Sequence, residues 1–253
     1  MELLLLLLAW GLTGAFPLED TKLCPLHSQP WQVSLHSQGT TCSGVLINKW
    51  WLVTSFACAP RSTSVIASLG EQDVTVDEGT EQHIPVADVI YHDPYRSPLH
   101  SLVMVRLVEP ARLNQYVQPI GLPGRCPQPG DSCSVSGWGS TVPQQYESPK
   151  LLKCLTVTVV EDQTCMSTFP DYIFWSIGMV CAGGANETNC LHDNGAVLVC
   201  DGQLQGVQWF SHGCENEEHP SVYTKLCMYN DWMRRVMDNY IPTTTKAWST
   251  TSL

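Results

Sequence analysis

Twelve cysteines lie between positions 24 and 227 of this 253-residue chain, and they restrict its possible folds more than any other feature. Their number is even, and no two of them form the Cys-x-x-Cys pairs that are typical of zinc sites. In an oxidising compartment such a set indicates disulfide bonds rather than free thiols. Counting cysteines alone leaves on the order of thousands of pairings open.

The first residues predict export from the cell. The stretch "MELLLLLLAWGL" is apolar but too short to span a bilayer, and small residues follow it where a signal peptidase would cut. We therefore expect a signal peptide over residues 1–15 and a secreted, extracellular protein. A buried N-terminal strand is the alternative for this stretch. No later segment is long and apolar enough to predict membrane insertion.

Composition and charge limit the partners. With 43% hydrophobic and 15% charged residues, the chain can bury a full core as one large domain or two fused small ones. The formal net charge of -11 argues against nucleic acid and anionic membranes, because binding phosphates requires clustered lysines and arginines. The triplet Asn186-Glu187-Thr188 predicts N-glycosylation of Asn186. No pattern predicts a cofactor or a metal.

The segmentation of the chain predicts an all-β protein. From about position 32 to position 227, short apolar or β-branched segments alternate with Gly, Pro, Ser and Asn. Only the end looks helical, and we expect a helix over 228–240 that Asn230 or Asp231 can cap. Its apolar residues recur at helical spacing: Trp232, Met233, Val236, Met237 and Tyr240. The Ser/Thr-rich tail 241–253 is expected to be a loose extension.

Several separated stretches resemble the trypsin/kallikrein family of chymotrypsin-fold serine proteases. In chain order they read "HSQPWQVSL", "CSGVLINKWWLVTSFAC", "SCSVSGWGST", "MVCAGG", "LQGV" and "PSVYTKL". The similarity covers nearly all of residues 24–240 and is therefore far more specific than a single motif. It implies a trypsin-like domain over 16–240, built from two six-stranded antiparallel β-barrels, roughly 24–120 and 121–227, with a C-terminal α-helix.

The resemblance also implies a complete disulfide framework. Carried over position by position, the implied pairs are Cys24–Cys154, Cys42–Cys58, Cys126–Cys227, Cys133–Cys200, Cys165–Cys181 and Cys190–Cys214. No cysteine is left over. A framework of this kind stabilises a secreted domain independently of its cleft.

The positions that the resemblance assigns to the catalytic triad hold Ala57, Ser101 and Asn194. A methyl group cannot accept a proton, a serine cannot compensate an imidazolium charge, and a carboxamide is not a useful nucleophile at neutral pH. His100, beside the carboxylate position, is retained. We therefore expect that the chain is not an enzyme but an inactive homologue of serine endopeptidases.

Other parts of the implied cleft also depart from the family pattern. His192 stands at the oxyanion position, where the family has a glycine. The pocket is expected to be filled by side chains at its four substituted positions: Thr188, Trp209, Ser211 and Ser221. Asp193 is retained, but "LEDT" at 18–21 offers no basic cleavage site that would free an ammonium group to pair with it. We expect Asp193 to be solvated, neutralised or bonded locally.

Two functions from different classes follow. The leading hypothesis is a secreted, monomeric homologue without a catalytic triad that acts non-enzymatically by binding a protein partner, as an inhibitor decoy, by sequestering a substrate or by regulating a protease. The alternative is a residual hydrolase, since a Cys190–Cys214 bridge would bring His192 and Asp193 near Ser211 and His212. Metal binding through the two histidines and Asp193 is a weaker third reading.

Overall fold

The computed structural model describes residues 22–37, 40–59, 65–92, 101–141, 150–169, 177–184, 190–212, 214 and 219–241. The expected signal peptide, the tail beyond position 241, His100, Asn186 and Thr188 lie outside the described residues. Within these ranges, no helix reaches the length and hydropathy needed to cross a bilayer.

The first half of the chain forms a closed antiparallel barrel. Its strand order is β1-β2-β3-β6-β5-β4. The bounds are β1 (Gln32–Ser37), β2 (Thr40–Asn48), β3 (Trp51–Ser55), β4 (Ile66–Leu69), β5 (Gln82–Tyr91) and β6 (Leu102–Leu107). Successive side chains point to opposite faces of a strand, so Ile84 and Val86 face the core while His83 and Pro85 are exposed. Closure leaves this sheet without free edges.

The second half forms a six-stranded antiparallel sheet in the order β8-β7-β10-β11-β12-β9. An isolated bridge between Val159 and Ala182 joins its two edges, which makes the sheet barrel-like. The bounds are β7 (Ser132–Gly137), β8 (Lys153–Thr158), β9 (Met179–Ala182), β10 (Val197–Cys200), β11 (Gln203–Phe210) and β12 (Ser221–Lys225). The predicted all-β fold with two six-stranded antiparallel sheets is confirmed.

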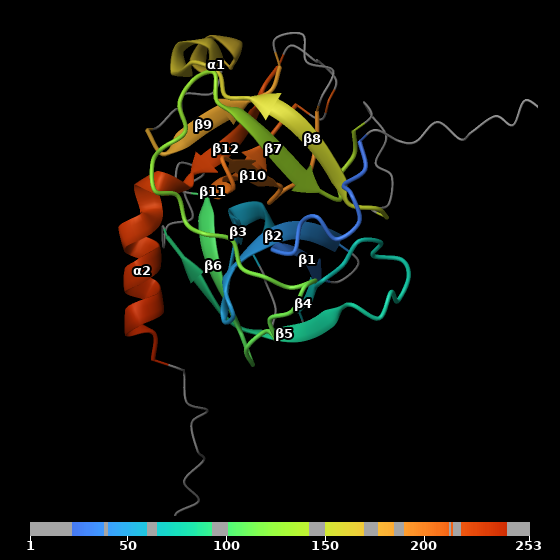
Figure 1. Cartoon of the computed structure of the whole chain (residues 1–253). Coiled ribbons are helices and arrows are strands. Elements are labelled where there is room, and N and C mark those ends of the chain that lie inside the picture. Colours follow the sequence, from blue (N-terminus) through green and yellow to red (C-terminus); the bar gives the residue numbers. More distant parts are fainter. Residues whose placement is uncertain are drawn as a thin grey trace, which may run out of the picture.

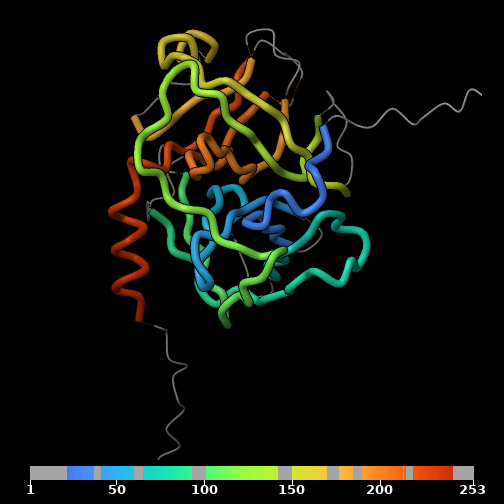
Figure 2. The backbone as a smooth tube through the Cα atoms, viewed as in Figure 1, coloured from blue at the N-terminus to red at the C-terminus, as the bar shows by residue number. Residues whose placement is uncertain are grey.

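Residues 22–24 pair with the second half of the chain. Leu23 forms a bridge with Lys153, and the Cys24 amide donates to the carbonyl oxygen of Leu152 at 3.0 Å. This segment therefore extends the second sheet, although it precedes the first barrel in sequence. The connection between the halves, residues 108–131, runs over the surface of both (Figure 2).

Two α-helices accompany the strands, α1 (Asp162–Thr168) and α2 (Asn230–Asn239), with 3-10 turns η1 (Phe56–Cys58) and η3 (Leu226–Tyr229). The short helix α1 was not expected. Helix α2 begins two residues later than predicted, and the Asn230 side chain donates to the Pro123 carbonyl at 2.7 Å instead of capping the helix. Its expected apolar face packs into a core shared by both halves, beside the first barrel (Figure 1).

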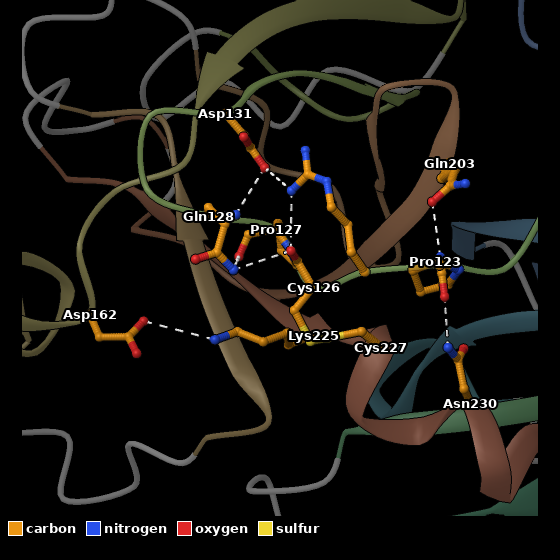
Figure 3. Close-up of a disulfide and its surroundings, with 12 residues drawn as sticks. Pro123, Cys126, Pro127, Gln128, Asp131, Asp162, Gln203, Lys225, Cys227 and Asn230 are labelled. Carbon is orange, nitrogen blue, oxygen red and sulfur yellow. Dashed lines mark hydrogen bonds and ion pairs between the residues drawn. A yellow bond between two sulfur atoms is a disulfide. The ribbon is translucent and has the colours of Figure 1, made fainter.

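All six implied disulfides are present, and no cysteine is free. Figure 3 shows Cys126–Cys227, which ties the connection between the halves to the turn that precedes α2. At the surface beside it, the Arg125 guanidinium contacts the carboxylates of Asp131 and Asp201 at 2.6 Å each. The covalent bond and the Asn230 hydrogen bond together fix where α2 starts.

We predict that the Cys126→Ala/Cys227→Ala double variant loses about 2–5 kcal/mol of unfolding free energy, because its denatured chain regains the freedom of a long loop. Urea denaturation monitored by tryptophan fluorescence measures the loss. The matched control is Arg125→Gln, which removes only exposed ion pairs next to the same disulfide and should have little effect. Equal unfolding free energies of the double variant and the control would contradict a stabilising role of the Cys126–Cys227 disulfide.

Candidate functional site

Positions 57, 101 and 194 meet where the first barrel contacts the second sheet. Ala57 is exposed on the turn η1, and the Phe56 amide before it donates to the Ser101 hydroxyl at 3.1 Å. The carbonyl oxygen of Asn194 accepts a hydrogen bond from the Ser43 amide at 3.1 Å and lies 3.0 Å from the Sγ of Cys58. The fold therefore brings together the three positions of the implied triad, which hold Ala57, Ser101 and Asn194.

Asp193 is buried between the two halves and bonded locally. Its Oδ2 accepts hydrogen bonds from the Ser43 hydroxyl at 2.5 Å and from the Trp138 amide at 2.8 Å. The Asp193 amide itself donates to the Gln208 side-chain oxygen at 3.0 Å. Of the three environments expected for this carboxylate, local bonding is the one that the structure adopts.

Burial raises the pKa of the Asp193 carboxyl from 3.8 to about 6, while donors from Ser43, Trp138 and Gly139 oppose the rise. The pKa in the folded protein is thus above its unfolded value. The stabilising contribution of this group is complete below about pH 4 and is lost as the pH rises through about 6.

The backbone after Asp193 passes very close to the first barrel. Gly195 has a φ of 83°, and a Cβ at this position would overlap the carbonyl oxygen of Ser43. Glycine is the residue that adopts this conformation and allows this approach without strain. The Gly195 amide donates to the Gln208 carbonyl at 2.8 Å, which holds the turn against strand β11.

The backbone amide at the oxyanion position is engaged inside the protein. The His192 N–H donates to the carbonyl oxygen of Ser140 at 2.9 Å, in an isolated bridge. This amide is therefore already engaged by a carbonyl of the same chain. That the replacement of glycine by His192 removes an oxyanion donor stays a prediction.

The His192 side chain faces Ser211 across the Cys190–Cys214 disulfide. Its Nδ1 lies 2.5 Å from the Ser211 hydroxyl, and burial lowers the pKa of the imidazole. The juxtaposition expected for the alternative site is therefore present for these two residues. The Asp193 carboxylate instead bonds to Ser43, and the His212 ring stacks on Phe169 with centroids 5.4 Å apart.

Of the four expected pocket residues, Ser221 lines a cavity of about 10 Å³, which is room for about one water molecule, together with Tyr223 of β12 and Cys190. Trp209 and Ser211 are not among the residues that line this cavity, and Thr188 lies outside the described residues. Trp209 is half-buried beside Phe210, with ring centroids 5.7 Å apart. Over the described part of the chain, no cluster of His, Cys, Asp or Glu is placed to hold a metal ion.

The partners of Asp193 were not among the predicted site residues. Ser43 follows Cys42 in the block "CSGVLINKWWLVTSFAC", where the family pattern has Cys-Gly-Gly. The hydroxyl group that this serine adds could have indicated a hydrogen-bond donor from the sequence. Gln208 gave no such signal. Its side chain bridges the Asp193 amide and the Leu191 carbonyl, the second bond at 2.8 Å, and only the fold brings these groups together.

We predict that Ser43→Ala lowers the unfolding free energy by about 1–3 kcal/mol at pH 8 and by clearly less at pH 4. Above its pKa of about 6 the Asp193 carboxylate is charged and needs the hydroxyl donor, whereas the protonated acid at pH 4 does not. Urea denaturation at both pH values measures the difference. Ser132→Ala, on an exposed residue of β7, is the control. A loss that is independent of pH would count against the Ser43–Asp193 bond.

Comparisons with known proteins agree with this geometry. The family model described as Trypsin matches residues 20–233. Trypsin-2 of Salmo salar is 38% identical over 236 residues, covering 90% of this chain and 100% of the relative. Kallikrein-8 of Mus musculus is 38% identical over 249 residues and covers 94% of each chain. The solved structure of neuropsin, a serine protease expressed in the limbic system of mouse brain, has a TM-score of 0.78 and 36% identity, covering 86% of this chain and 98% of that one.

These comparisons contradict the expectation that the chain is not an enzyme. Relatives at 37–38% identity over most of its length are trypsins, a kallikrein and a serine protease by name. That expectation relied on the side chains at positions 57, 101 and 194, which do not exclude chemistry at other groups of the same cleft. The matched family model and the relatives together show that the chain belongs to the trypsin family of serine proteases.

Proposed function

We propose that this chain is a secreted trypsin-family protein that binds an extended segment of a protein partner along the rim of its cleft. Six disulfides that use every cysteine support an oxidising, extracellular location. The net charge of -11 favours a protein over nucleic acid as the partner. The argument for the binding surface comes from strand β11.

Strand β11 extends beyond its neighbour β10. Their pairing ends at Val197 and Val207, and the Gln208 backbone bonds to Gly195 and Ala196 on that side. Trp209 and Phe210 continue the strand. An extended peptide can add to such a strand end through main-chain hydrogen bonds.

Aromatic side chains surround this strand end. We call the group Trp209, Phe210, His212 and His219, which packs around the buried ring of Phe169, the aromatic rim. Neighbouring ring centroids, that of Phe169 included, lie 4.9–5.8 Å apart. Protein interfaces are enriched in aromatic residues, which contribute large contact areas at low entropic cost. The rim beside the end of β11 is the single observation that carries this proposal.

The residues at the expected pocket positions favour contact along the rim over insertion of a side chain. Ser211 and Ser221 stand where the family resemblance implies glycines, and Thr188 stands where it implies an aspartate that would pair with Arg or Lys. We therefore expect the partner's contact area to come from the strand end and from the aromatic rim. This arrangement suits the regulatory or sequestering roles that the sequence suggests.

We predict that Phe210→Ala weakens partner binding about tenfold or more, because it removes a central ring of the rim. Immobilised wild type, Phe210→Ala and Val108→Ala are each exposed to proteins of the native extracellular fluid, and retained proteins are quantified. Val108 is an exposed aliphatic residue following β6 and serves as the control. Thermal unfolding of each variant verifies folding. Retention of the same proteins by all three would contradict the proposed surface.

A second candidate function, ester or amide hydrolysis, is favoured by the 2.5 Å contact between Ser211 and His192. Burial lowers the pKa of His192, so the imidazole is neutral at pH 7 and its Nδ1 can accept a proton. The Ser211 Oγ would attack the substrate carbonyl carbon while its proton moves to Nδ1. The imidazolium would then return that proton to the leaving group. With this pair of residues, the chain could catalyse hydrolysis as its serine protease relatives do, although through different side chains.

For this candidate we predict that a fluorophosphonate probe labels Ser211, with an Oγ–P bond formed and fluoride released. His192→Gln should slow labelling by about 10²-fold or more, the usual contribution of a general base. Mass spectrometry of the labelled peptide identifies the residue. Ser221→Ala changes a neighbouring buried serine and should leave labelling intact. Unlabelled wild type, or labelling that survives Ser211→Ala, would exclude this pair as the reactive site.

A further inference from the structure

A cavity of about 410 Å³ lies between the β2–β3 turn and the end of α2. Its lining residues are Asn48, Lys49, Trp50, Trp51, Arg106, Met237 and Tyr240. Ligand pockets of proteins have volumes from about 300 to 1,000 Å³, so this cavity can take a small organic molecule. Nothing in the cleft chemistry uses it.

The cavity is separate from the cleft. Trp51 pairs with Arg106 at one end of β3 and β6, whereas Ser55 pairs with Leu102 at the other end, next to the Ala57 turn. Four residues of strand span about 13 Å. A ligand in the cavity would therefore not contact the groups of the candidate site.

The Arg106 guanidinium provides a fixed positive charge in the cavity. Its central carbon stands 3.7 Å above the Trp50 ring and 5.1 Å from the Tyr240 ring. One terminal nitrogen, Nη1, approaches the carbonyls of Leu107 at 3.3 Å and Trp50 at 3.5 Å. The Nε of Arg106 is buried, has no hydrogen-bond partner in the described part of the chain and is closed to a ligand. The other terminal nitrogen, Nη2, makes no hydrogen bond within the described residues and is not among the buried atoms, so it can donate to an acceptor supplied from outside.

Charges of both signs lie near Arg106. The Asp88 carboxylate interacts with the charge of Arg106 and accepts a hydrogen bond from the Tyr240 hydroxyl. Burial and that bond raise the pKa of Tyr240 to about 12, so the phenol stays neutral. Lys49, which is exposed, adds a second positive charge at the cavity wall. Two cationic side chains thus line one cavity of a chain whose net charge is -11.

The apolar walls are held in place by hydrogen bonds and ring contacts. The Asn48 side-chain oxygen accepts from the amides of Trp50 and Trp51 at 2.8 and 3.0 Å. Its Nδ2 reaches the Met237 sulfur at 3.0 Å, and Trp51 meets Tyr240 edge to face with centroids 5.1 Å apart. A preformed wall of this kind lowers the entropic cost of binding.

We propose that this cavity binds a small organic anion, a carboxylate carried on a flat apolar body. The carboxylate bonds to the Nη2 nitrogen of Arg106, in a charge-assisted contact that Lys49 reinforces. The flat body packs against Met237 and the parts of Trp50 and Tyr240 that Arg106 does not cover. A cationic ligand is disfavoured, because Arg106 and Lys49 would repel it.

The test uses 2-naphthoate as the probe and the uncharged 2-naphthamide as its matched ligand, with wild-type protein. Tryptophan fluorescence follows binding because Trp50 and Trp51 line the cavity, and titration calorimetry gives the affinity. We expect saturable binding of naphthoate below about 1 mM and affinity for naphthamide reduced about tenfold or more. Arg106→Gln should lower naphthoate affinity about tenfold or more, and Arg112→Gln, at an exposed arginine outside the cavity, should not.

Three results would overturn the proposal: no saturable binding of naphthoate by folded wild type, equal affinity for naphthamide, or unchanged affinity in folded Arg106→Gln. If Arg106→Gln fails to fold, two other measurements test the proposal. These are the affinities of wild type for naphthoate and naphthamide, and the affinity of Lys49→Gln for naphthoate. The lysine is exposed and its removal leaves the Arg106 stacking intact. Weaker naphthoate binding by Lys49→Gln supports the site, and unchanged binding there together with equal ligand affinities rejects it.

Discussion

The hydrogen bond from the Ser43 hydroxyl to the buried carboxylate of Asp193 joins the two halves at the point where the cleft forms. A carboxylate in this position costs several kcal/mol of unfolding free energy unless donors surround it. The chain supplies those donors from both halves, Ser43 from the first and Trp138 from the second. Within the described residues, the protein thereby satisfies the charge with a side-chain hydroxyl and a backbone amide.

The inward direction of Asp193 determines where its neighbours lie. His192 turns toward Ser211, and Asn194 is exposed at the cleft surface. Successive residues of an extended chain face opposite sides. Because the Asp193 carboxylate points into the protein, the His192 imidazole lies on the other face, where it contacts Ser211. Hydrogen bonds from both halves therefore hold the cleft together at Asp193. The cavity at the far end of β3 and β6, for which we propose an anionic ligand, is a second, independent feature of the same scaffold.

Much of the fold could be predicted from the sequence, because the cysteine positions and the short apolar segments depend on local pattern and on family resemblance. The disulfides, both six-stranded sheets and the apolar face of α2 follow from such patterns. The partners of Asp193 could not be predicted, because Ser43 and Gln208 come together only through tertiary packing. Helix α1 is too short for a periodic signal. The expectation of no enzymatic function was wrong. It was inferred from three side chains, whereas the similarity to serine proteases extends over most of the chain.

The central claim is that Asp193 is a buried carboxyl held by neutral donors of the same chain. Carbon-13 NMR of protein labelled at the aspartate carboxyl groups, with the Asp193 signal assigned by its absence in Asp193→Asn, measures the titration of this group directly. The account predicts a midpoint near pH 6, above the ordinary value of 3.8. A midpoint below about 4 would show that the carboxylate is solvated or paired with a cation, and would contradict the account.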